Sequence, residues 1–177
     1  TDDATLELDG ARGVTTAVVG GTTYLFVTGS VDDGVSVFSV AADGTPTAGF
    51  DGTDVVQTHM TNSRLTDPEV LEWRLPVVLE SYAIRAGSGG AGRWRGGNGG
   101  TRRIRFLEPM TASILSGHRR IPPHGMAGGL PGAPGRNWVE RADGTRVELG
   151  GADRTDVGPG DVFVIETPGG GGYGTPK

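Results

Sequence analysis

The alternation of apolar and polar residues in the first quarter of the chain predicts three short strands. Residues 13–19, 22–28 and 35–41 are rich in valine, threonine and aromatic residues, which favour extended backbone. Gly20-Gly21 separates the first two runs and Asp32-Asp33-Gly34 separates the next two, and both suit tight turns with positive φ. The pattern therefore predicts a three-stranded antiparallel meander.

The segment after the meander contains the clearest helix signal in the chain. Asp67 and Pro68 place a capping residue before a proline, Glu69 follows in the first turn, and Pro76 ends the segment. We expect one short helix, from Pro68 to about Leu75. Alternation beyond it predicts strands at 77–85, 102–107, 111–116, 137–141, 146–149 and 161–167, with a hairpin turn at 142–145.

Together these elements predict a mainly β fold: the three-stranded antiparallel meander, and a β-rich, sandwich- or barrel-like region with one short helix. In the strand at 102–107, Arg103 and Arg105 are expected on the face opposite to Ile104 and Phe106. Residues 46–56, interrupted by proline and glycine, are a plausible junction. We therefore divide the chain into residues 1–48 and 49–177.

Composition narrows the class of protein. The chain has 33 glycines and 11 prolines, about a quarter of its 177 residues, but they punctuate apolar runs as turns do. No apolar run approaches the roughly 18 residues of a membrane span, and no targeting leader follows Thr1. The absence of cysteine excludes disulfides and thiolate nucleophiles. We expect a cytoplasmic protein without membrane contact, although a cysteine-free chain would equally suit secretion.

Charge is distributed unevenly along the chain, whose net charge is −5. Residues 1–56 hold nine acidic side chains and one basic side chain, Arg12, whereas residues 85–120 hold eight arginines and one acid, Glu108. Such asymmetry suggests two parts of different origin, or an acidic segment packed against a basic one.

The meander resembles one blade of a lactonase-like or haemolysin-type β-propeller over about residues 1–48, on the stretch YLFVTGSVDDGVSVFSVAADGT. A single blade cannot bury both of its faces, and no second copy occurs in the sequence. We therefore expect it to pack on the rest of the chain or on another chain. The glycine-aspartate nonapeptide that binds calcium is missing, so no calcium site is inferred.

Three later stretches point to one enzyme family. They are THMTNSRLTDPEVLEWRLPVVLESYAIRAGSGGAGRWRGGNGGTRRIRF, GRNWVERADG and PGDVFVIETPGGGGYG. In this order they resemble the C-terminal part of the hydantoinase B / 5-oxoprolinase family, from about residue 56 to 174. The resemblance implies hydrolysis of cyclic amides such as hydantoins and 5-oxoproline, often coupled to ATP cleavage on a partner subunit or domain. Related complexes carboxylate ketones.

The resemblance does not include the family's long N-terminal part, where its metal-binding histidines and carboxylates are expected. No cofactor is therefore evident from this sequence, and no metal ligand carries over to any position in it.

Candidate catalytic residues gather within a short stretch: His59, Asn62, Arg64, Asp67 and Glu69. In a cyclic-amide hydrolase His59 could carry a proton near neutral pH, and Arg64 or Asn62 could hold a developing oxyanion. A structural interpretation competes with this one. In it Asp67 caps the helix, Asn62 orders a turn, and Arg64 pairs with a nearby glutamate.

Two glycine-rich runs each allow a functional and a structural interpretation. Residues 87–92 match the dinucleotide fingerprint, but RWRGGNGG follows where the fingerprint needs a helix, so dinucleotide binding is disfavoured. The closing run, Gly169–Gly172 before Tyr173, is either a loop that folds over a ligand or a frayed terminus.

The arginine-rich run 93–105, with Trp94 inside it, is typical of segments that bind single-stranded nucleic acid. The acidic balance of the chain disfavours that function, and arginines that meet the acidic first fifty residues explain the run more simply. His118 and His124 could join His59 at a metal, but their spacing matches no metal motif, so surface histidines are preferred.

Three functions remain open. In order of preference they are a hydrolase acting on amide or ester bonds of a small-molecule substrate, a non-catalytic assembly module, and an anion- or nucleic-acid-binding module. Strands without an obvious partner in the chain predict a homo-oligomer, and a dimer is expected.

Overall fold

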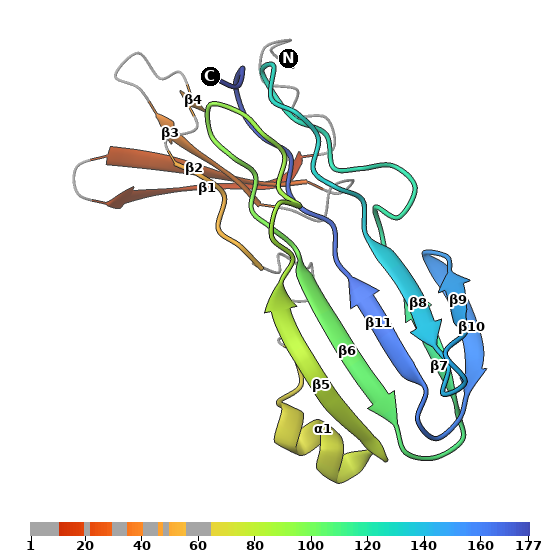
Figure 1. Cartoon of the computed structure of the whole chain (residues 1–177). Coiled ribbons are helices and arrows are strands. Elements are labelled where there is room, and N and C mark those ends of the chain that lie inside the picture. The colour runs from red at the N-terminus through yellow and green to blue at the C-terminus, as the bar shows by residue number, and fades with distance from the viewer. Residues whose placement is uncertain (1–10, 20–21, 30–34, 41–45, 48–49, 56–64) are drawn as a thin grey trace.

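The computed structural model describes residues 11–19, 22–29, 35–40, 46–47, 50–55 and 65–177, and the statements below concern those residues. They form strands arranged in antiparallel sheets together with one short helix, so the predicted mainly β fold is confirmed. Figure 1 shows the strands of the C-terminal part running along a single long body, with the helix at one edge.

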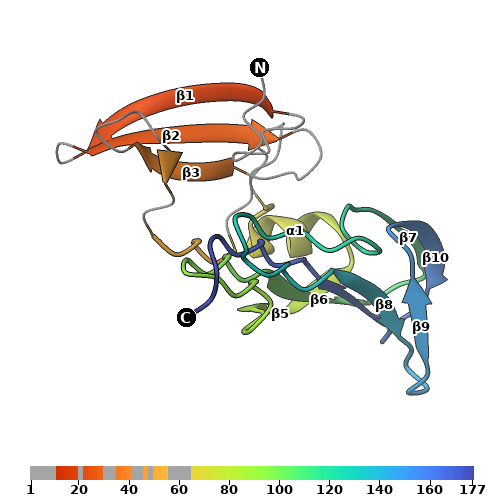
Figure 2. The same cartoon turned by 90° about the horizontal axis from the view of Figure 1, so that it is seen from above.

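The first sheet is the predicted meander. Strands β1 (Ala11–Val19), β2 (Thr22–Gly29) and β3 (Val35–Val40) pair antiparallel in chain order. A two-residue strand that the sequence did not predict, β4 (Pro46–Thr47), adds to its edge. Proline is tolerated there because an edge strand need not donate every amide. The sheet stands beside the C-terminal body in Figure 2, and the residues predicted to form its turns lie outside the described part of the chain.

The second sheet has five antiparallel strands in the order β5-β6-β11-β8-β9. Strand β9 follows β8 through the predicted hairpin, in which Gly144 has a φ of 85°. The strands lie within two residues of their predicted bounds: β5 (Val77–Ile84), β6 (Gly100–Phe106), β8 (Arg136–Glu140), β9 (Arg146–Leu149) and β11 (Val162–Glu166).

A two-stranded ribbon, β7 (Met110–Leu115) with β10 (Ala152–Val157), covers one face of this sheet. The core lies between the two layers, where Phe106, Val139 and Phe163 of the sheet meet Ala112 and Val157 of the ribbon. Burial of each large side chain contributes about 1.5–3 kcal/mol. Leu71, from helix α1 (Pro68–Arg74), packs against the same cluster and fixes the helix beside the sheet.

Beyond one end of the five-stranded sheet, three glycine-rich segments run side by side (Figure 1). They are residues 87–99, 123–135 and 167–174, and we call them the glycine bundle. Their backbones bond to one another: the amide of Gly90 donates to the Gly170 carbonyl and that of Gly170 to the Gly97 carbonyl, both at 2.8 Å. The amide of Gly172 donates to the Leu130 carbonyl at 2.9 Å.

Contact between these backbones leaves no room for side chains at the shared positions. A Cβ built at Gly169 would overlap the Ser88 carbonyl oxygen, and one at Gly171 would overlap the His124 carbonyl oxygen. Only glycine fits where backbones approach this closely, for the same reason that it is required at the axis of collagen. Glycine is therefore needed here for its lack of volume.

The contacts of the bundle decide between the alternative interpretations of both glycine runs, residues 87–92 and 169–172. The closing run is neither a frayed terminus nor a loop free to fold over a ligand, because it is bonded between the other two segments. In the run at 87–92, the amide of Gly89 donates to Asn98 Oδ1 at 3.0 Å and that of Gly90 to the bundle. These amides are not available to a pyrophosphate.

We expect Gly171→Ala to lower the free energy of unfolding by about 1–3 kcal/mol, because the new methyl group forces two backbones apart. Gly158→Ala is the matched control: no atom lies within 4 Å of a Cβ at that position. Its effect should be near zero or slightly stabilising. Denaturant unfolding of both variants measures the difference. Equal stability of the two would show that the bundle is loosely packed.

Candidate functional site

The residues just before the predicted catalytic stretch are attached to the glycine bundle. Asp54 Oδ1 accepts from the Asn98 amide at 2.7 Å and pairs with Arg95 Nη1 at 3.1 Å. The bond from the Asn98 amide is the main reason that the pKa of Asp54 lies below its ordinary value. Asp51 Oδ1 accepts from the Arg95 amide at 2.7 Å. The expected contact between the acidic and basic segments is thus seen at Arg95.

Val55, the last described residue before that stretch, has an unusual backbone. Its φ is 55°, in the left-handed region that β-branched residues rarely occupy. Its amide donates to the Asn98 carbonyl at 2.8 Å, so the contact with the bundle holds this conformation in place. Strain of this kind persists only where the surroundings impose it.

On the other side of the predicted stretch, helix α1 is anchored at its start and along its length. Asp67 is the N-cap, and its Oδ1 accepts from the Glu69 amide at 2.9 Å. Further along, Glu72 Oε1 accepts from the Leu79 amide of β5 at 2.8 Å. Two fixed points therefore flank the segment that contains His59.

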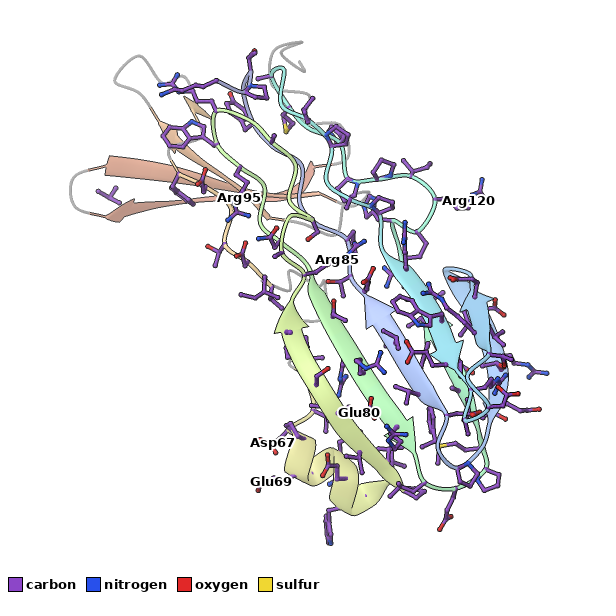
Figure 3. All side chains as sticks on the ribbon, viewed as in Figure 1. Asp67, Glu69, Glu80, Arg85, Arg95 and Arg120 are labelled. Atoms are coloured by element: carbon purple, nitrogen blue, oxygen red, sulfur yellow. The ribbon has the colours of Figure 1, made fainter. Side chains whose placement is uncertain are left out.

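The structure places two of the five predicted site residues. Asp67 serves as the helix cap, as the structural interpretation holds, and Glu69 is exposed in the first turn. Figure 3 shows both on the side of α1 that faces away from the sheet. His59, Asn62 and Arg64 lie outside the described residues, so the grouping of all five stays a prediction.

The arginines of β6 pair across strands. Arg103 Nη1 and Nη2 donate to the two carboxylate oxygens of Glu140 at 3.0 and 2.7 Å, and its Nε donates to Glu80 Oε2 at 3.2 Å. The other oxygen of Glu80 accepts from Arg105. We call Glu80, Arg103, Arg105 and Glu140 the charge ladder. Arg103 and Arg105 lie opposite the core residues Ile104 and Phe106, as predicted.

The acidic side chains of the first fifty residues lie outside the described part of the chain, so the expectation that Arg103 and Arg105 meet them stays a prediction. Among the described residues their carboxylate partners are Glu80 and Glu140, on neighbouring strands of the same sheet. The ladder lies on the sheet face opposite the main core. A second cluster of buried residues lies on β8, which it shares with the ladder, and on β11: Trp138, Val162 and Val164.

The ladder extends to Trp138, whose Nε1 donates to Glu140 Oε1 at 3.0 Å. The Arg146 guanidinium lies 3.9 Å from the centre of the Trp138 ring. Hydrogen bonds from Arg103 and Trp138 lower the pKa of Glu140 to about 2. This carboxylate therefore stays ionised in the fold, where it acts as a structural anion.

A further polar cluster, which sequence reasoning missed, lies where β8 begins. Asn137, almost fully buried, accepts from Arg119 Nη2 at 3.0 Å and donates to Ser116 Oγ at 3.1 Å. Burial, and then the charge of Arg85, lower the pKa of Arg119. Arg85 pairs with Glu166 at 3.1 Å. Only contacts between residues far apart in sequence reveal this cluster, so no local pattern could have signalled it.

The histidines do not form a metal site in the described part of the chain, where no three His, Asp or Glu side chains gather. The Nδ1 of His118 lies 3.0 Å from the Ile121 carbonyl oxygen. The backbone φ of His118 is 52°. The third histidine of the predicted set, His59, lies outside the described residues.

Comparison with known proteins identifies the family to which the chain belongs. A family profile described as Hydantoinase B/oxoprolinase matches residues 9–176. The chain belongs to this family. The match includes the meander as well as the C-terminal body, so it extends further toward the N-terminus than the resemblance seen in the sequence.

Individual relatives agree with the assignment. The chain is 45% identical to 5-oxoprolinase 1 of Arabidopsis thaliana over 126 residues, which are 71% of this chain and 10% of that protein. The crystal structure of the ATP-dependent caprolactamase from Pseudomonas jessenii shares 29% identity with a TM-score of 0.55, covering 62% of this chain and 20% of that one. An acetone carboxylase structure, at 22% identity and a TM-score of 0.57, covers 81% of this chain and 22% of its own and shows the shared fold.

This chain therefore spans about a tenth of the length of the 5-oxoprolinases that it matches. Among the described residues, no helix has the length and apolar character of a bilayer span.

We expect Asp67→Ala to lower the free energy of unfolding by about 1 kcal/mol, because the Glu69 amide loses its acceptor. Asp67→Asn keeps a capping oxygen and should stay within a few tenths of a kcal/mol of the parent. Denaturant unfolding at neutral pH measures both. A full loss of stability in the asparagine variant would mean that the charge matters more than the cap.

Glu140→Gln should destabilise the protein in a pH-dependent way. A pKa lowered from 4.5 to about 2 would correspond to about 3 kcal/mol in a shielded site. The side chain is 38% exposed, so we expect about 1–2 kcal/mol at pH 7. Because the folded pKa is depressed, this contribution is complete above about pH 4.5 and disappears as the pH falls through about 2.

Glu148→Gln is the control, because that glutamate pairs with Arg146 at 2.6 Å but is 65% exposed. Urea unfolding as a function of pH measures both variants. A Glu140→Gln effect that persists undiminished to the lowest pH would contradict the assigned role of the charge.

Proposed function

We propose that this chain is part of a hydrolase that cleaves an amide or ester bond in a small, cyclic substrate. Membership of the hydantoinase B/oxoprolinase family supports the proposal. So do relatives named 5-oxoprolinase and caprolactamase, three of which are at least 45% identical over the matched region. On its own the chain should show modest, promiscuous activity, because it spans only a fraction of those proteins.

The observation that carries the proposal is the anchoring on both sides of the predicted catalytic stretch. Asp54 is bonded to the glycine bundle, and Asp67 caps a helix that packs on the core. Rigid flanking elements suit catalysis, because reacting groups must be held within a fraction of an ångström.

Within the proposal each residue has a role. His59 transfers the proton, and Arg64 with Asn62 stabilises the oxyanion that forms when water attacks the carbonyl. Glu69 orients Arg64, and Asp67 fixes the start of the helix. We propose a cytoplasmic homo-oligomer as the form of the chain.

A non-catalytic assembly module is the second candidate. The rigid glycine bundle and the capping role of Asp67 favour it, because both are structural. Binding of nucleic acid through residues 93–105 has less support. Three arginines of that run, Arg95, Arg103 and Arg105, already pair with carboxylates.

The resemblance of residues 1–48 to a propeller blade also remains a proposal. The three antiparallel strands β1–β3 are compatible with it. The family match from residue 9 supports a different origin, in which the meander belongs to the family itself.

Alanine substitutions at His59 and Arg64 test the hydrolase directly. Each should lower kcat/KM by about 10²- to 10⁴-fold on a panel of hydantoin, 5-oxoproline, caprolactam and activated esters, assayed with and without ATP. The melting temperature should not change. Arg120→Ala, at an exposed arginine in a separate loop (Figure 3), is the control and should keep full activity.

Absence of turnover in the parent chain, or variants that lose stability and activity in parallel, would favour the assembly module. Binding to a polynucleotide that weakens steeply with added salt would favour the third function.

A further inference from the structure

Helix α1 presents an apolar face to solvent. Trp73 is 83% exposed and Val70 is 39% exposed, and residues three apart lie on the same side of a helix. Leu65 and Leu75, next to the two ends of the helix, are also exposed. We call these four residues the α1 face. No residue of the helix is buried.

The helix holds this face rigidly. Seven residues are too few for a stable helix in isolation, so its neighbours fix α1. Leu71 packs on the core, Asp67 caps the first turn, and Glu72 bonds to the Leu79 amide of β5. A rigidly presented aromatic side chain loses little entropy when it binds, and tryptophan is the residue type most enriched at the energetic centre of interfaces.

We infer that the α1 face is a docking surface for the portion of the hydantoinase B fold that lies outside these 177 residues. The inference rests on family membership and is independent of the proposed hydrolysis. The relatives supply an occupant: in 5-oxoprolinase 1 of Arabidopsis thaliana the matching region is only 10% of the protein, and in the caprolactamase structure it is 20% of the chain. The chemistry of the α1 face requires an apolar pocket that admits an indole ring, with a polar rim beside Glu69.

The size of the α1 face argues against a second copy of this chain as the occupant. A tryptophan buries about 150–250 Å², and with its three smaller neighbours the face reaches about half of the roughly 800 Å² per partner that a stable dimer needs. A contact of this size is sufficient when a covalent connection or a larger assembly already holds the partners at high effective concentration.

Chimeric proteins test the inference without an activity assay. Residues 65–177 replace the matching region of the Saccharomyces cerevisiae 5-oxoprolinase, which is 49% identical over 110 residues. Four versions carry the parent sequence, Trp73→Ser, Trp73→Phe, or the control Leu115→Ser at a residue that is 90% exposed on β7. The same substitutions are made in the 177-residue chain alone. Melting temperature, acrylamide quenching of tryptophan emission and hydrogen exchange of the α1 amides are measured in each.

We expect Trp73 to be freely quenched in the 177-residue chain and shielded in the chimera, with α1 amides that exchange at least tenfold more slowly in the chimera. Trp73→Ser should lower the melting temperature of the chimera but leave that of the 177-residue chain unchanged, and Trp73→Phe should restore most of the loss. Leu115→Ser should affect both proteins equally.

Three results would overturn the inference: a Trp73 equally quenched in both proteins, a Trp73→Ser effect of the same size in both, or a Trp73 already shielded in the 177-residue chain. A concentration-dependent dimer that Trp73→Ser abolishes would identify a second copy as the occupant. If the yeast chimera is insoluble, caprolactamase subunit beta of Pseudomonas jessenii provides the second host. A chimera soluble only as Trp73→Ser would show that the indole has no pocket there, which also contradicts the inference.

Discussion

The direct contact of backbone with backbone in the glycine bundle determines how the rest of the C-terminal body is arranged. Its three segments connect β5 to β6, lead into β8 and follow β11, so the bundle joins four of the five strands of the sheet at one end. At Gly90, Gly96, Gly169, Gly171 and Gly172 a neighbouring backbone leaves no room even for a methyl group, so the segments can approach this closely only where these glycines lie. The bundle also offers the Asn98 amide and carbonyl to Asp54 and Val55. The packing of the glycines thus fixes the positions of Asp54 and Val55, just before the predicted catalytic stretch.

The two faces of the five-stranded sheet are covered by different physical means. On one face the ribbon of β7 and β10 buries Val139 and Phe163 in an apolar core. On the other face the charge ladder lies beside Trp138, Val162 and Val164, and no second apolar layer of strands or helix is needed among the described residues. Long arginine side chains cover apolar surface with their methylene groups while their guanidinium groups stay paired. Five of the eight arginines of residues 85–120 are thus engaged in the fold: Arg85, Arg95, Arg103, Arg105 and Arg119.

Local pattern predicted most of the elements, and it failed where contacts are long-range. Alternation located β5, β8 and β11, and the Asp67-Pro68 pair located α1, because each signal lies within a few residues. Strand β10 was missed because its sequence, ADRTDV, has a single buried residue, Val157, and no apolar alternation. The role of Gly169–Gly172 could not be read from the sequence either, since it depends on carbonyl groups of Ser88 and His124 more than forty positions away. In the candidate site, the cap at Asp67 was predicted correctly from the sequence. The pairing of Arg103 with Glu140 could not be predicted, because it depends on the order of the strands in the sheet.

Helix α1 carries residues of both the proposed catalytic site and the proposed docking surface. Glu69 and Trp73 are four residues apart, so they share one side of α1, and Asp67 lies at the start of the same helix. Occupation of the α1 face by the larger portion of the fold would bring Asp67 and Glu69 to the boundary between the two portions. Binding sites for small molecules form preferentially at such boundaries, where two surfaces enclose a cleft and exclude water. An exposed carboxylate such as Glu69 is a poor catalyst in open solvent, because water screens its charge, and a docked partner would remove that screening. The same contact that covers Trp73 would in this way exclude water from the side of α1 on which the proposed hydrolysis places Glu69.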